Sequence, residues 1–372
     1  MQVIGARNVH HALPTALWLL DEYGVTSESR NGLVKVVPEP VTTKYTHPRE
    51  RVMFWPSRDA NPFFHFYEAL WMLGGCNDVE RLAAILPKMR EYSDDGTTFH
   101  GAYGHRWLWQ FDFNQLEFIA RHLRNNHNDR RQVLQIWNAD TDLQGQAGKK
   151  DLPCNLVAHF QIRTGALDMT VFNRSNDIIW GCYGANAVHF SMLQEVMAAW
   201  VGVPVGCYWQ ISDNWHAYIS SLEKVAHLGS YAPAAQAGKF DGLRIASPYE
   251  MYEEHQDVKV AGNNSVETVR APVGEPIAKV FSMVNGPIEH WFEDLDMFLN
   301  EPDVLGYRDV FFRTVAVPMM ETLRVYRDVN KTKALITANQ IMATDWRLAV
   351  KQWIQRRIDK RKKAEDDGVA YE

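Results

Sequence analysis

The sequence has few cysteines and lacks the short motifs that identify common metal and cofactor sites. Its 372 residues include four cysteines, Cys76, Cys154, Cys182 and Cys207, and no CxxC pair. This spacing indicates neither a zinc site nor a disulfide framework, and it fits reduced thiols in a cytoplasm. The patterns GxGxxG, GxxxxGKS/T and HExxH are also absent. The sequence therefore gives no sign of a dinucleotide, P-loop or zinc-protease site, and we expect no metal.

Long apolar runs and an excess of basic charge are absent as well. No window approaches the roughly eighteen uninterrupted apolar residues of a membrane span, and the start Met1–Gly5 lacks the features of a signal peptide. The formal net charge of -6 gives no general attraction to nucleic acid. With 46% apolar and 12% aromatic residues, the composition is that of a globular chain. We expect a soluble cytoplasmic protein that contacts no membrane.

The sequence does contain a predicted β-hairpin with reactive side chains at its open end. Residues Leu156–Gln161 alternate in polarity, and Leu167–Phe172 forms a second strand after a turn at Arg163–Gly165. Antiparallel pairing would make Cys154 and Arg174 neighbours, each just outside the paired segment. A cation beside a cysteine favours the thiolate, which is the nucleophilic form.

Other segments predict a protein of mixed helices and strands. Phe63–Leu73 and Val188–Trp200 have apolar residues at helical spacing, and we expect the second to be a central buried helix. The same spacing in Leu335–Ile358 predicts a third helix, which ends in a basic run. Gly, Ala, Pro and Asn are frequent in 229–246 and 262–276, which predicts loops around a small insertion.

An ordered set of motifs resembles the thymidylate synthase family, including its pyrimidine hydroxymethylase branch. Each motif alone is weak, but together they follow the family's order and spacing over roughly residues 25 to 225. The motifs are Glu68-Ala69-Leu70-Trp71, Tyr103-Gly104-His105-Arg106-Trp107, Arg130-Arg131, Trp137-Asn138, Leu152-Pro153-Cys154, Asn173-Arg174-Ser175-Asn176-Asp177, Gly181, Asn186 and Asp213 to Tyr218.

The resemblance implies an α+β fold, with a mixed or antiparallel sheet and helices packed around a long central buried helix. It predicts a catalytic core at 1–229 and a divergent insertion and return segment of the same domain at 230–334. A C-terminal helix with a basic tail would follow at 335–372.

The resemblance also implies one-carbon transfer to C5 of a pyrimidine deoxynucleoside monophosphate, with 5,10-methylenetetrahydrofolate as co-substrate. The sulfur of Cys154 would add to C6 and make C5 nucleophilic. Glu68 and Tyr103 would belong to the network that transfers protons. Asp177 would contact the pterin ring of the folate.

Five residues match family positions that bind the substrate's phosphate. Arg174 and Ser175 would hold the phosphate in their own subunit, and Arg174 would lower the pKa of the nearby thiol. Arg130 and Arg131 match a pair that reaches the phosphate across a dimer interface, so the resemblance implies a homodimer. Arg30 matches an early phosphate-binding arginine, although little of the glycine-rich context is present.

The sugar and base contacts favour deoxyuridylate (dUMP). His216 and Tyr218 match residues that bond the ribose 3'-hydroxyl. The Asn186 amide can accept from N3–H and donate to O4 of uracil, whereas cytosine presents the opposite pattern. Because Gly181–Asn186 is one residue longer than the usual family spacing, deoxycytidylate (dCMP) remains an alternative substrate.

Two departures from the family bear on the product. Asn155 stands where the family has a histidine, and the apolar tail that closes the site is replaced by a long basic helix. Reductive methylation needs hydride transfer in a site closed to water, whereas water gives a hydroxymethyl group. We therefore predict hydroxymethylation of dUMP, as in viruses that modify DNA precursors, in the host cytoplasm.

Three alternatives stay open. The first is reductive methylation of dUMP, and the second is hydroxymethylation or methylation of dCMP. The third, from another class, is a non-catalytic nucleotide- or RNA-binding relative with the basic tail as its contact surface. The intact thiol of Cys154 argues against a pure binding protein.

Overall fold

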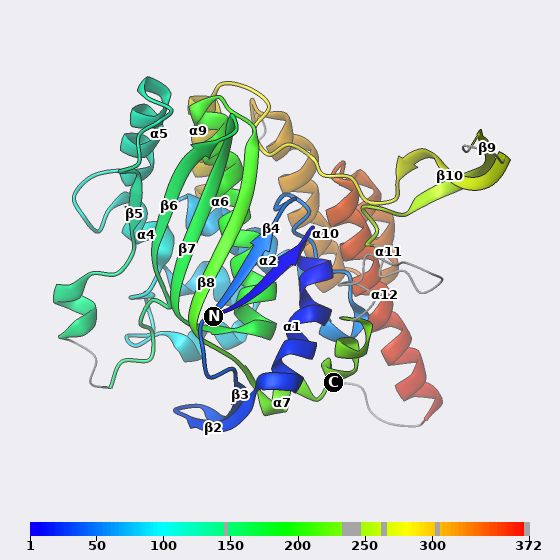
Figure 1. Cartoon of the computed structure of the whole chain (residues 1–372), viewed down its shortest axis with the longest axis horizontal. Coiled ribbons are helices and arrows are strands. Elements are labelled where there is room, and N and C mark those ends of the chain that lie inside the picture. The colour runs from blue at the N-terminus through cyan, green and yellow to red at the C-terminus, as the bar shows by residue number, and fades with distance from the viewer. Residues whose placement is uncertain (145–147, 233–246, 262–265, 302–305, 368–372) are drawn as a thin grey trace.

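The fold is of the α+β class, with one mixed sheet, helices behind it and a β-hairpin that projects from the body (Figure 1). The computed structural model describes residues 1–144, 148–232, 247–261, 266–301 and 306–367. Within these ranges, no helix has the length and apolar character needed to cross a membrane.

The large sheet has the strand order β1-β4-β8-β7-β6-β5, and the β2–β3 hairpin joins it through β3 and the end of β8. The pairs β1–β4 and β7–β8 are parallel and the others are antiparallel, which makes the sheet mixed. The strands are β1 Gln2–Ala6, β2 Val25–Ser29, β3 Gly32–Val36, β4 Val41–Tyr45, β5 Val133–Gln135, β6 Asn155–Arg163, β7 Ala166–Asp177 and β8 Val205–Tyr218. The separate hairpin comprises β9 Tyr252–Ala261 and β10 Val266–Pro276.

The predicted central buried helix is confirmed as α6, because nearly all of its side chains are buried and it ends at Gly202 in the left-handed conformation. It packs against α2 and against the sheet strands β7 and β8. The helices are α1 Val9–Tyr23, α2 Pro62–Leu73, α3 Val79–Ile85, α4 Tyr103–Leu108, α5 Gln115–Asn125, α6 Asn186–Val201, α7 Ile219–Leu222, α9 Ile288–Asn300, α10 Val317–Asp328, α11 Lys331–Thr337 and α12 Thr344–Asp366.

The predicted β6–β7 hairpin forms, but its second strand is longer than expected. Thr164 and Gly165 form the turn with φ values of 49° and 80°, the left-handed conformation that tight hairpin turns require. We expected Arg174 just outside the paired segment, whereas β7 continues to Asp177. The reason is a second partner, because β7 pairs in parallel with β8 from Leu167, and this pairing continues to Asp177 after the pairing with β6 ends at Asn173.

Two other boundaries differ from expectation. Most of the predicted loop 262–276 is strand β10, because β9 supplies an antiparallel partner that local composition does not reveal. The predicted helix Leu335–Ile358 is interrupted between α11 and α12 by a 3-10 turn at Ala338–Gln340 and by extended backbone at Ile341. Ile341 is nevertheless buried, so the apolar spacing continues across the break. Residues 233–246 of the other predicted loop lie outside the described residues.

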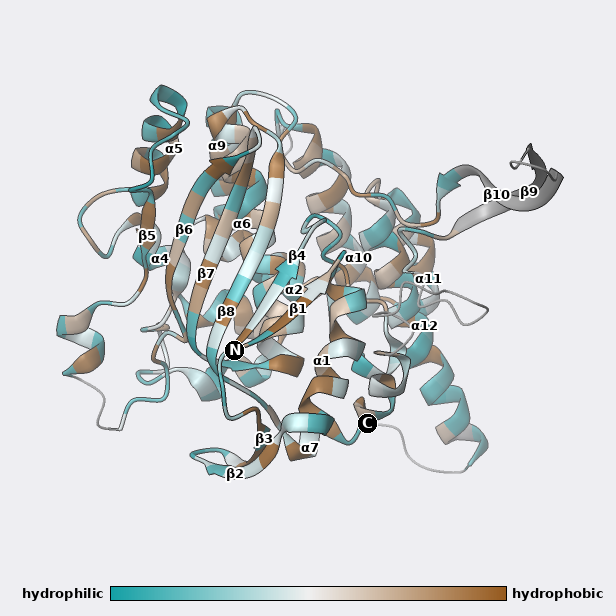
Figure 2. Ribbon diagram, in the orientation of Figure 1, coloured by the Kyte–Doolittle hydropathy of each residue, from teal (hydrophilic) through white to brown (hydrophobic). Residues whose placement is uncertain are grey.

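In the described part of the chain, no helix lies in front of the face of β6–β8 that is opposite α6 (Figure 1). Apolar patches alternate with polar ones along these strands (Figure 2). Phe172 on β7 and Val133 on β5 are 39% and 47% exposed, although both are large apolar residues of the sheet. An exposed apolar sheet face in a protein of this size is typical of an interaction surface.

Candidate active site

Four predicted residues, Glu68, Tyr103, Cys154 and Asn186, line one cleft of about 310 Å³. Its walls come from α2, from α4 and the segment before it, from the start of α6, and from the chain that leads into β6. Segments far apart in the sequence therefore converge on the thiol. We expected these residues in one site, and the cleft brings them together.

Cys154 immediately precedes β6, and Arg174 holds this part of the chain in place. The Arg174 amide donates to the Cys154 carbonyl at 3.0 Å. The Arg174 guanidinium donates to the carbonyls of Pro153 and Leu152, both at 3.0 Å. The predicted proximity of Cys154 and Arg174 is confirmed, and the arginine also orders the backbone on which the thiol stands.

The pKa of the Cys154 thiol is raised above its ordinary value, contrary to the expected preference for the thiolate. Burial is the main cause, and the negative charge of Asp151 adds to it. Arg174 and Arg30 lower the pKa, as expected of nearby cations, but burial outweighs them. In the free protein, the sulfur is therefore held mainly as the neutral thiol.

Tyr103 enters the cleft at the first residue of α4. A Cβ atom on the next residue, Gly104, would lie 1.7 Å from the carbonyl oxygen of Met72, so only glycine allows α4 to approach the end of α2 this closely. Burial, with a further contribution from the Cys154 thiol, raises the pKa of Tyr103. Tyr103 is therefore protonated at neutral pH and can donate a hydrogen bond.

Glu68 on α2 meets a histidine that sequence analysis did not select. Its Oε2 atom lies 3.0 Å from Nε2 of His189 on α6, and the two side chains are 14% and 4% exposed. His189 also lines the cleft. The sequence did contain a signal for His189 as a site residue, because it lies three residues after Asn186 and this spacing places both on one face of the helix. A lone histidine in an apolar helix is usually structural, and only packing of α2 against α6 reveals the contact.

Asn186 belongs to a chain of buried amides. Its Nδ2 donates to Oδ1 of Asn176 at 3.1 Å, and its Oδ1 accepts from Nδ2 of Asn155 at 3.5 Å. Asn176 in turn donates to Ser212 Oγ at 3.1 Å and to Gln210 Oε1 at 3.3 Å. The chain fixes the orientation of the Asn186 amide and leaves it one N–H and one oxygen lone pair.

Asp177 ends β7 and caps the helical turn that follows. Its Oδ1 accepts from the amides of Ile179 at 2.8 Å and Trp180 at 2.6 Å. Its Oδ2 is buried and has no hydrogen-bond partner among the described residues. Burial raises the pKa of this carboxyl group, while the Trp180 amide and the charge of His216 oppose the shift. An unpartnered buried acceptor is costly unless a ligand supplies a donor.

The predicted sugar-binding residues lie together at the end of β8, outside the cleft lining. His216 pairs in register with Asp177, and Ser175 pairs with Asn214. The His216 ring lies 5.5 Å from the Tyr218 ring in an edge-to-face arrangement, and its Nδ1 is 2.7 Å from Asn214 Oδ1. Burial lowers the pKa of His216, which favours the neutral imidazole.

The remaining arginines divide into two locations. Arg30, in the β2–β3 turn, donates to the carbonyls of Lys149 at 2.9 Å and Lys150 at 3.2 Å, so it lies beside the chain that leads to the thiol. Arg130 and Arg131 precede β5 and are exposed, and Arg131 pairs with Asp129 at 2.8 Å. Register places Val133 opposite His159, in the middle of β6. Arg130 and Arg131 therefore do not join the site of their own subunit.

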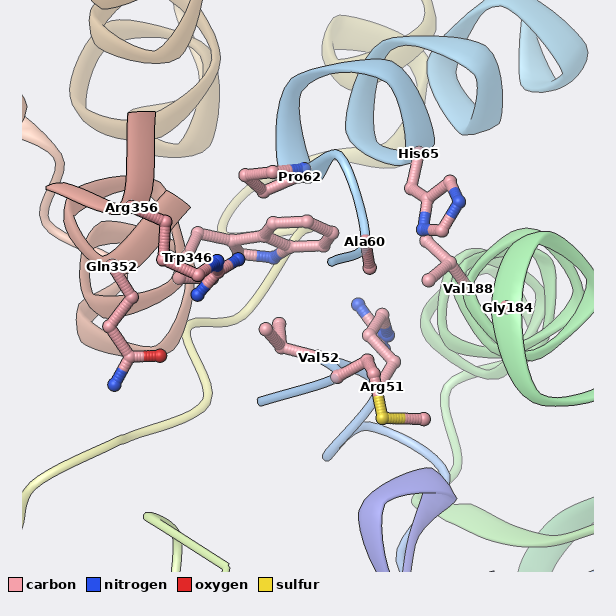
Figure 3. Close-up of a pocket in the computed structure, with 12 residues that line it drawn as sticks. Arg51, Val52, Ala60, Pro62, His65, Gly184, Val188, Trp346, Gln352 and Arg356 are labelled. Carbon is pink, nitrogen blue, oxygen red and sulfur yellow. The ribbon is translucent and has the colours of Figure 1, made fainter. Parts of the chain in front are cut away.

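Helix α12 packs on α2 and away from the cleft. Trp346 lies 5.2 Å from Phe66 between ring centres, and Arg356 pairs with Asp59 at 3.0 Å. Trp346 and Arg356 face Pro62 at the start of α2 across a narrow second pocket (Figure 3). The end of α12 is strongly hydrophilic (Figure 2). None of its described residues lines the cleft, and the tail at 368–372 lies outside the described residues.

Comparison with known proteins agrees with this arrangement. A family model described as "Thymidylate synthase" matches residues 22–274. The chain belongs to the thymidylate synthase family. It is 50% identical, over the full length of both chains, to a deoxyuridylate hydroxymethyltransferase of Pseudomonas phage M6. Proteins of the same name from Bacillus phage SP01 and Delftia phage PhiW-14 are 34% and 32% identical. These matches cover 70% and 54% of this chain, and 63% and 58% of the relatives.

Membership confirms the family resemblance and the α+β class predicted from the motifs. The match extends past residue 225, where the recognisable motifs end, into the β9–β10 hairpin. Within the described part of the chain, no group of three or more His, Cys, Asp or Glu side chains is arranged to hold a metal ion.

Proposed function

We propose that this protein transfers a one-carbon unit from 5,10-methylenetetrahydrofolate to C5 of dUMP and releases the hydroxymethylated nucleotide. The observation that carries the proposal is the 50% identity, over full length, to a phage protein named deoxyuridylate hydroxymethyltransferase. The cleft supports the same chemistry because it combines the Cys154 thiol, the Glu68 carboxylate and the Tyr103 phenol. In an infected cell, the reaction would take place in the host cytoplasm.

Covalent addition of Cys154 starts the proposed reaction. The sulfur bonds to C6 of the pyrimidine, and the electrons of the C5–C6 double bond move towards C5 and O4. Glu68 and Tyr103 would handle protons at O4 and C5, since both line the same cleft as the thiol. Arg174 and Arg30 favour the thiolate that must attack, because both lower the thiol's pKa.

Asn186 supports uracil as the base. The buried amide chain leaves Asn186 with one N–H and one lone pair, which are the groups that O4 and N3–H of uracil require. Cytosine presents an amino group and an unprotonated N3 instead. The residue that this chain has in addition to the usual family spacing before Asn186 lies in an irregular turn at Ile178–Ala185. Asn186 still reaches the cleft.

The folate would lie beside Asp177. The unpartnered Oδ2 of this buried carboxylate offers an acceptor to an N–H of the pterin ring. The bound folate supplies a carbon at the oxidation level of formaldehyde. Neighbouring His216 and Tyr218 would hold the 3'-hydroxyl of the nucleotide, and their position at the adjoining strand end supports this assignment.

Water as the final nucleophile is supported by two features. Asn155, in place of the family's histidine, is fully buried and bonds Asn186. Helix α12 packs on α2, and its described residues leave the cleft uncovered. A cleft open to water favours the hydroxymethyl product over hydride transfer.

The phosphate site would be shared between two subunits of a homodimer. Arg174 and Ser175 would bind the phosphate in their own subunit. Arg130 and Arg131 would come from the partner, which is supported by their exposure and by their distance along the hairpin from Cys154. The uncovered sheet face provides a surface on which a second copy can pack.

Incubation of the purified protein with dUMP or dCMP and methylenetetrahydrofolate tests the reaction. We expect mass analysis to show gain of one CH₂O group on dUMP, without dihydrofolate formation. Cys154→Ala should abolish turnover, whereas Cys207→Ala, at a half-buried cysteine of β8, should retain it. Gain of a methyl group with stoichiometric dihydrofolate would instead identify reductive methylation. Turnover of dCMP alone would overturn the base assignment.

Subunit complementation tests the shared phosphate site. Cys154→Ala and the double variant Arg130→Ala/Arg131→Ala should each be inactive at low dUMP concentration. Their mixed dimers contain one site with an intact thiol and intact partner arginines, so co-expression should recover about a quarter of wild-type activity. As a control, Cys154→Ala with Glu68→Gln should recover nothing, because both residues line the same cleft. Failure of the first mixture to recover activity would contradict the shared site.

A further inference from the structure

The contact between His189 and Glu68 joins two ionisable side chains on the wall of the cleft. Nε2 of His189 lies 3.0 Å from Oε2 of Glu68. Both atoms are inaccessible to solvent, and neither has a hydrogen bond of good geometry among the described residues, so each is the nearest candidate partner of the other. Glu68 meets the cleft through its other oxygen, because the side chain lines the cleft while Oε2 is enclosed. A buried carboxylate oxygen requires a partner, and His189 is placed to be that partner.

His189 is the one imidazole among the described residues that line this cleft. The position after the nucleophile is occupied by Asn155, which cannot exchange a proton at neutral pH. The nearby His65 on α2 is kept neutral, because burial, the charge of Arg58 and then that of His189 lower its pKa. The other ionisable groups on the cleft wall are Glu68, Tyr92, Tyr103, Lys150, Asp151 and Cys154.

We propose that His189 is a positioning residue for the hydration step: it fixes the Glu68 carboxylate and takes up the proton that Glu68 removes from the attacking water. The proposal rests on the hydroxymethylase function proposed above. It assigns to His189 a role in the second half of the reaction, after the one-carbon unit has been joined to C5 of the pyrimidine.

The water oxygen bonds to the exocyclic methylene carbon, and the proton it loses passes to Glu68 and is shared with His189. The electrons of the C5–methylene double bond move into the C5–C4–O4 enolate. Collapse of the enolate reforms the C5–C6 double bond and breaks the C6–S bond. Cys154 leaves as a thiolate, and return of the proton to it restores the resting enzyme.

The test separates hydration from the preceding steps in His189→Gln. Glutamine retains a hydrogen-bonding side chain of similar reach but cannot accept the proton. In a single turnover with enzyme in excess over [5-³H]dUMP, tritium release reports loss of the C5 proton, and chromatography measures the hydroxymethyl product in the same reaction. His127→Gln, in the exposed loop after α5, is the matched control.

We expect His189→Gln to lower hydroxymethyl formation by ~100-fold, which is within the range for loss of general-base catalysis. Tritium release should change by no more than ~3-fold. Added 2-mercaptoethanol should then give a thioether product in the variant, because a thiolate attacks the methylene without help from a base. An equal fall of tritium release and product, or unchanged values of both, would overturn the proposal. Dihydrofolate production by the wild-type enzyme would instead refute the underlying hydroxymethylase function.

Discussion

The buried ion pair between Arg106 and Asp142 stabilises the wall of the cleft that carries Tyr103. Arg106 is on the same short helix as Tyr103, and its Nη1 and Nη2 atoms lie 2.7 and 2.9 Å from the two oxygens of Asp142. The carboxylate also lies 2.7 Å from His100 Nε2 and accepts the amide of Asn138 at 2.8 Å. Both partners of the pair are essentially inaccessible, with side-chain exposures of 1% and 0%.

Asp142→Asn keeps the shape of this side chain but removes its charge. The substitution leaves the guanidinium of Arg106 buried without a counter-charge. It also turns the asparagine N–H₂ group towards one of the donors that now bind the carboxylate, such as the Arg106 guanidinium. Breaking one partner of a buried pair costs about 3–5 kcal/mol, a large part of the roughly 5–15 kcal/mol that stabilises a typical domain. Glu321→Gln is a matched control, because Arg324 binds Glu321 in the same two-contact manner at the surface. An exposed pair contributes about 0–1 kcal/mol.

Urea unfolding of wild type and both variants at neutral pH measures these losses. We expect a large drop in midpoint for Asp142→Asn at unchanged slope, and little change for Glu321→Gln. The pKa of Asp142 is lowered overall. Burial alone would raise it, but the hydrogen bonds from Arg106 and Asn138 outweigh burial. The stability from the pair is therefore present above about pH 4 and is lost as pH falls below it, and the variant should lack this dependence. Equal losses in the two variants would refute the reasoning.

Three further predictions follow from the same contacts. Burial raises the pKa of Asp345 to about 6, so its stabilising contribution is lost as pH rises from about 4 through about 6; Asp345→Asn should remove that loss in a series of Tm measurements. Asn186→Asp should raise the kcat/KM ratio of dCMP to dUMP by ~100-fold, and an unchanged ratio would show that this side chain does not contact the base. Phe172→Asp should abolish the dimer in sedimentation experiments and lower activity with it, whereas Ile336→Asp, at an exposed apolar residue on α11, should do neither.

The hairpin that carries the thiol was predictable because its information is local. Alternating polarity fixes the two strands, and antiparallel pairing then requires Cys154 and Arg174 to be neighbours. Helices α2 and α6 were predictable for a similar reason, since apolar spacing directly reports the face that a helix buries. The roles assigned to the site residues remain predictions that the experiments above address.

The strand and helix boundaries that were missed depend on partners distant in the sequence. The last residues of β7 are polar and resemble a loop, yet they extend along β8. β10 forms because β9 pairs with it, although its composition favours a loop. Local patterns do not contain these pairings, because a strand is stabilised by its neighbour as well as by its own residues.

The sequence by itself determined the family and the proximity of Cys154 to Arg174, because ordered motifs and strand alternation are properties of the chain alone. Only the tertiary structure decided that burial outweighs Arg174 in setting the pKa of Cys154. It also brought His189 to within 3.0 Å of Glu68. Both facts depend on which helices pack around the cleft, and burial and side-chain contact arise only when distant segments come together.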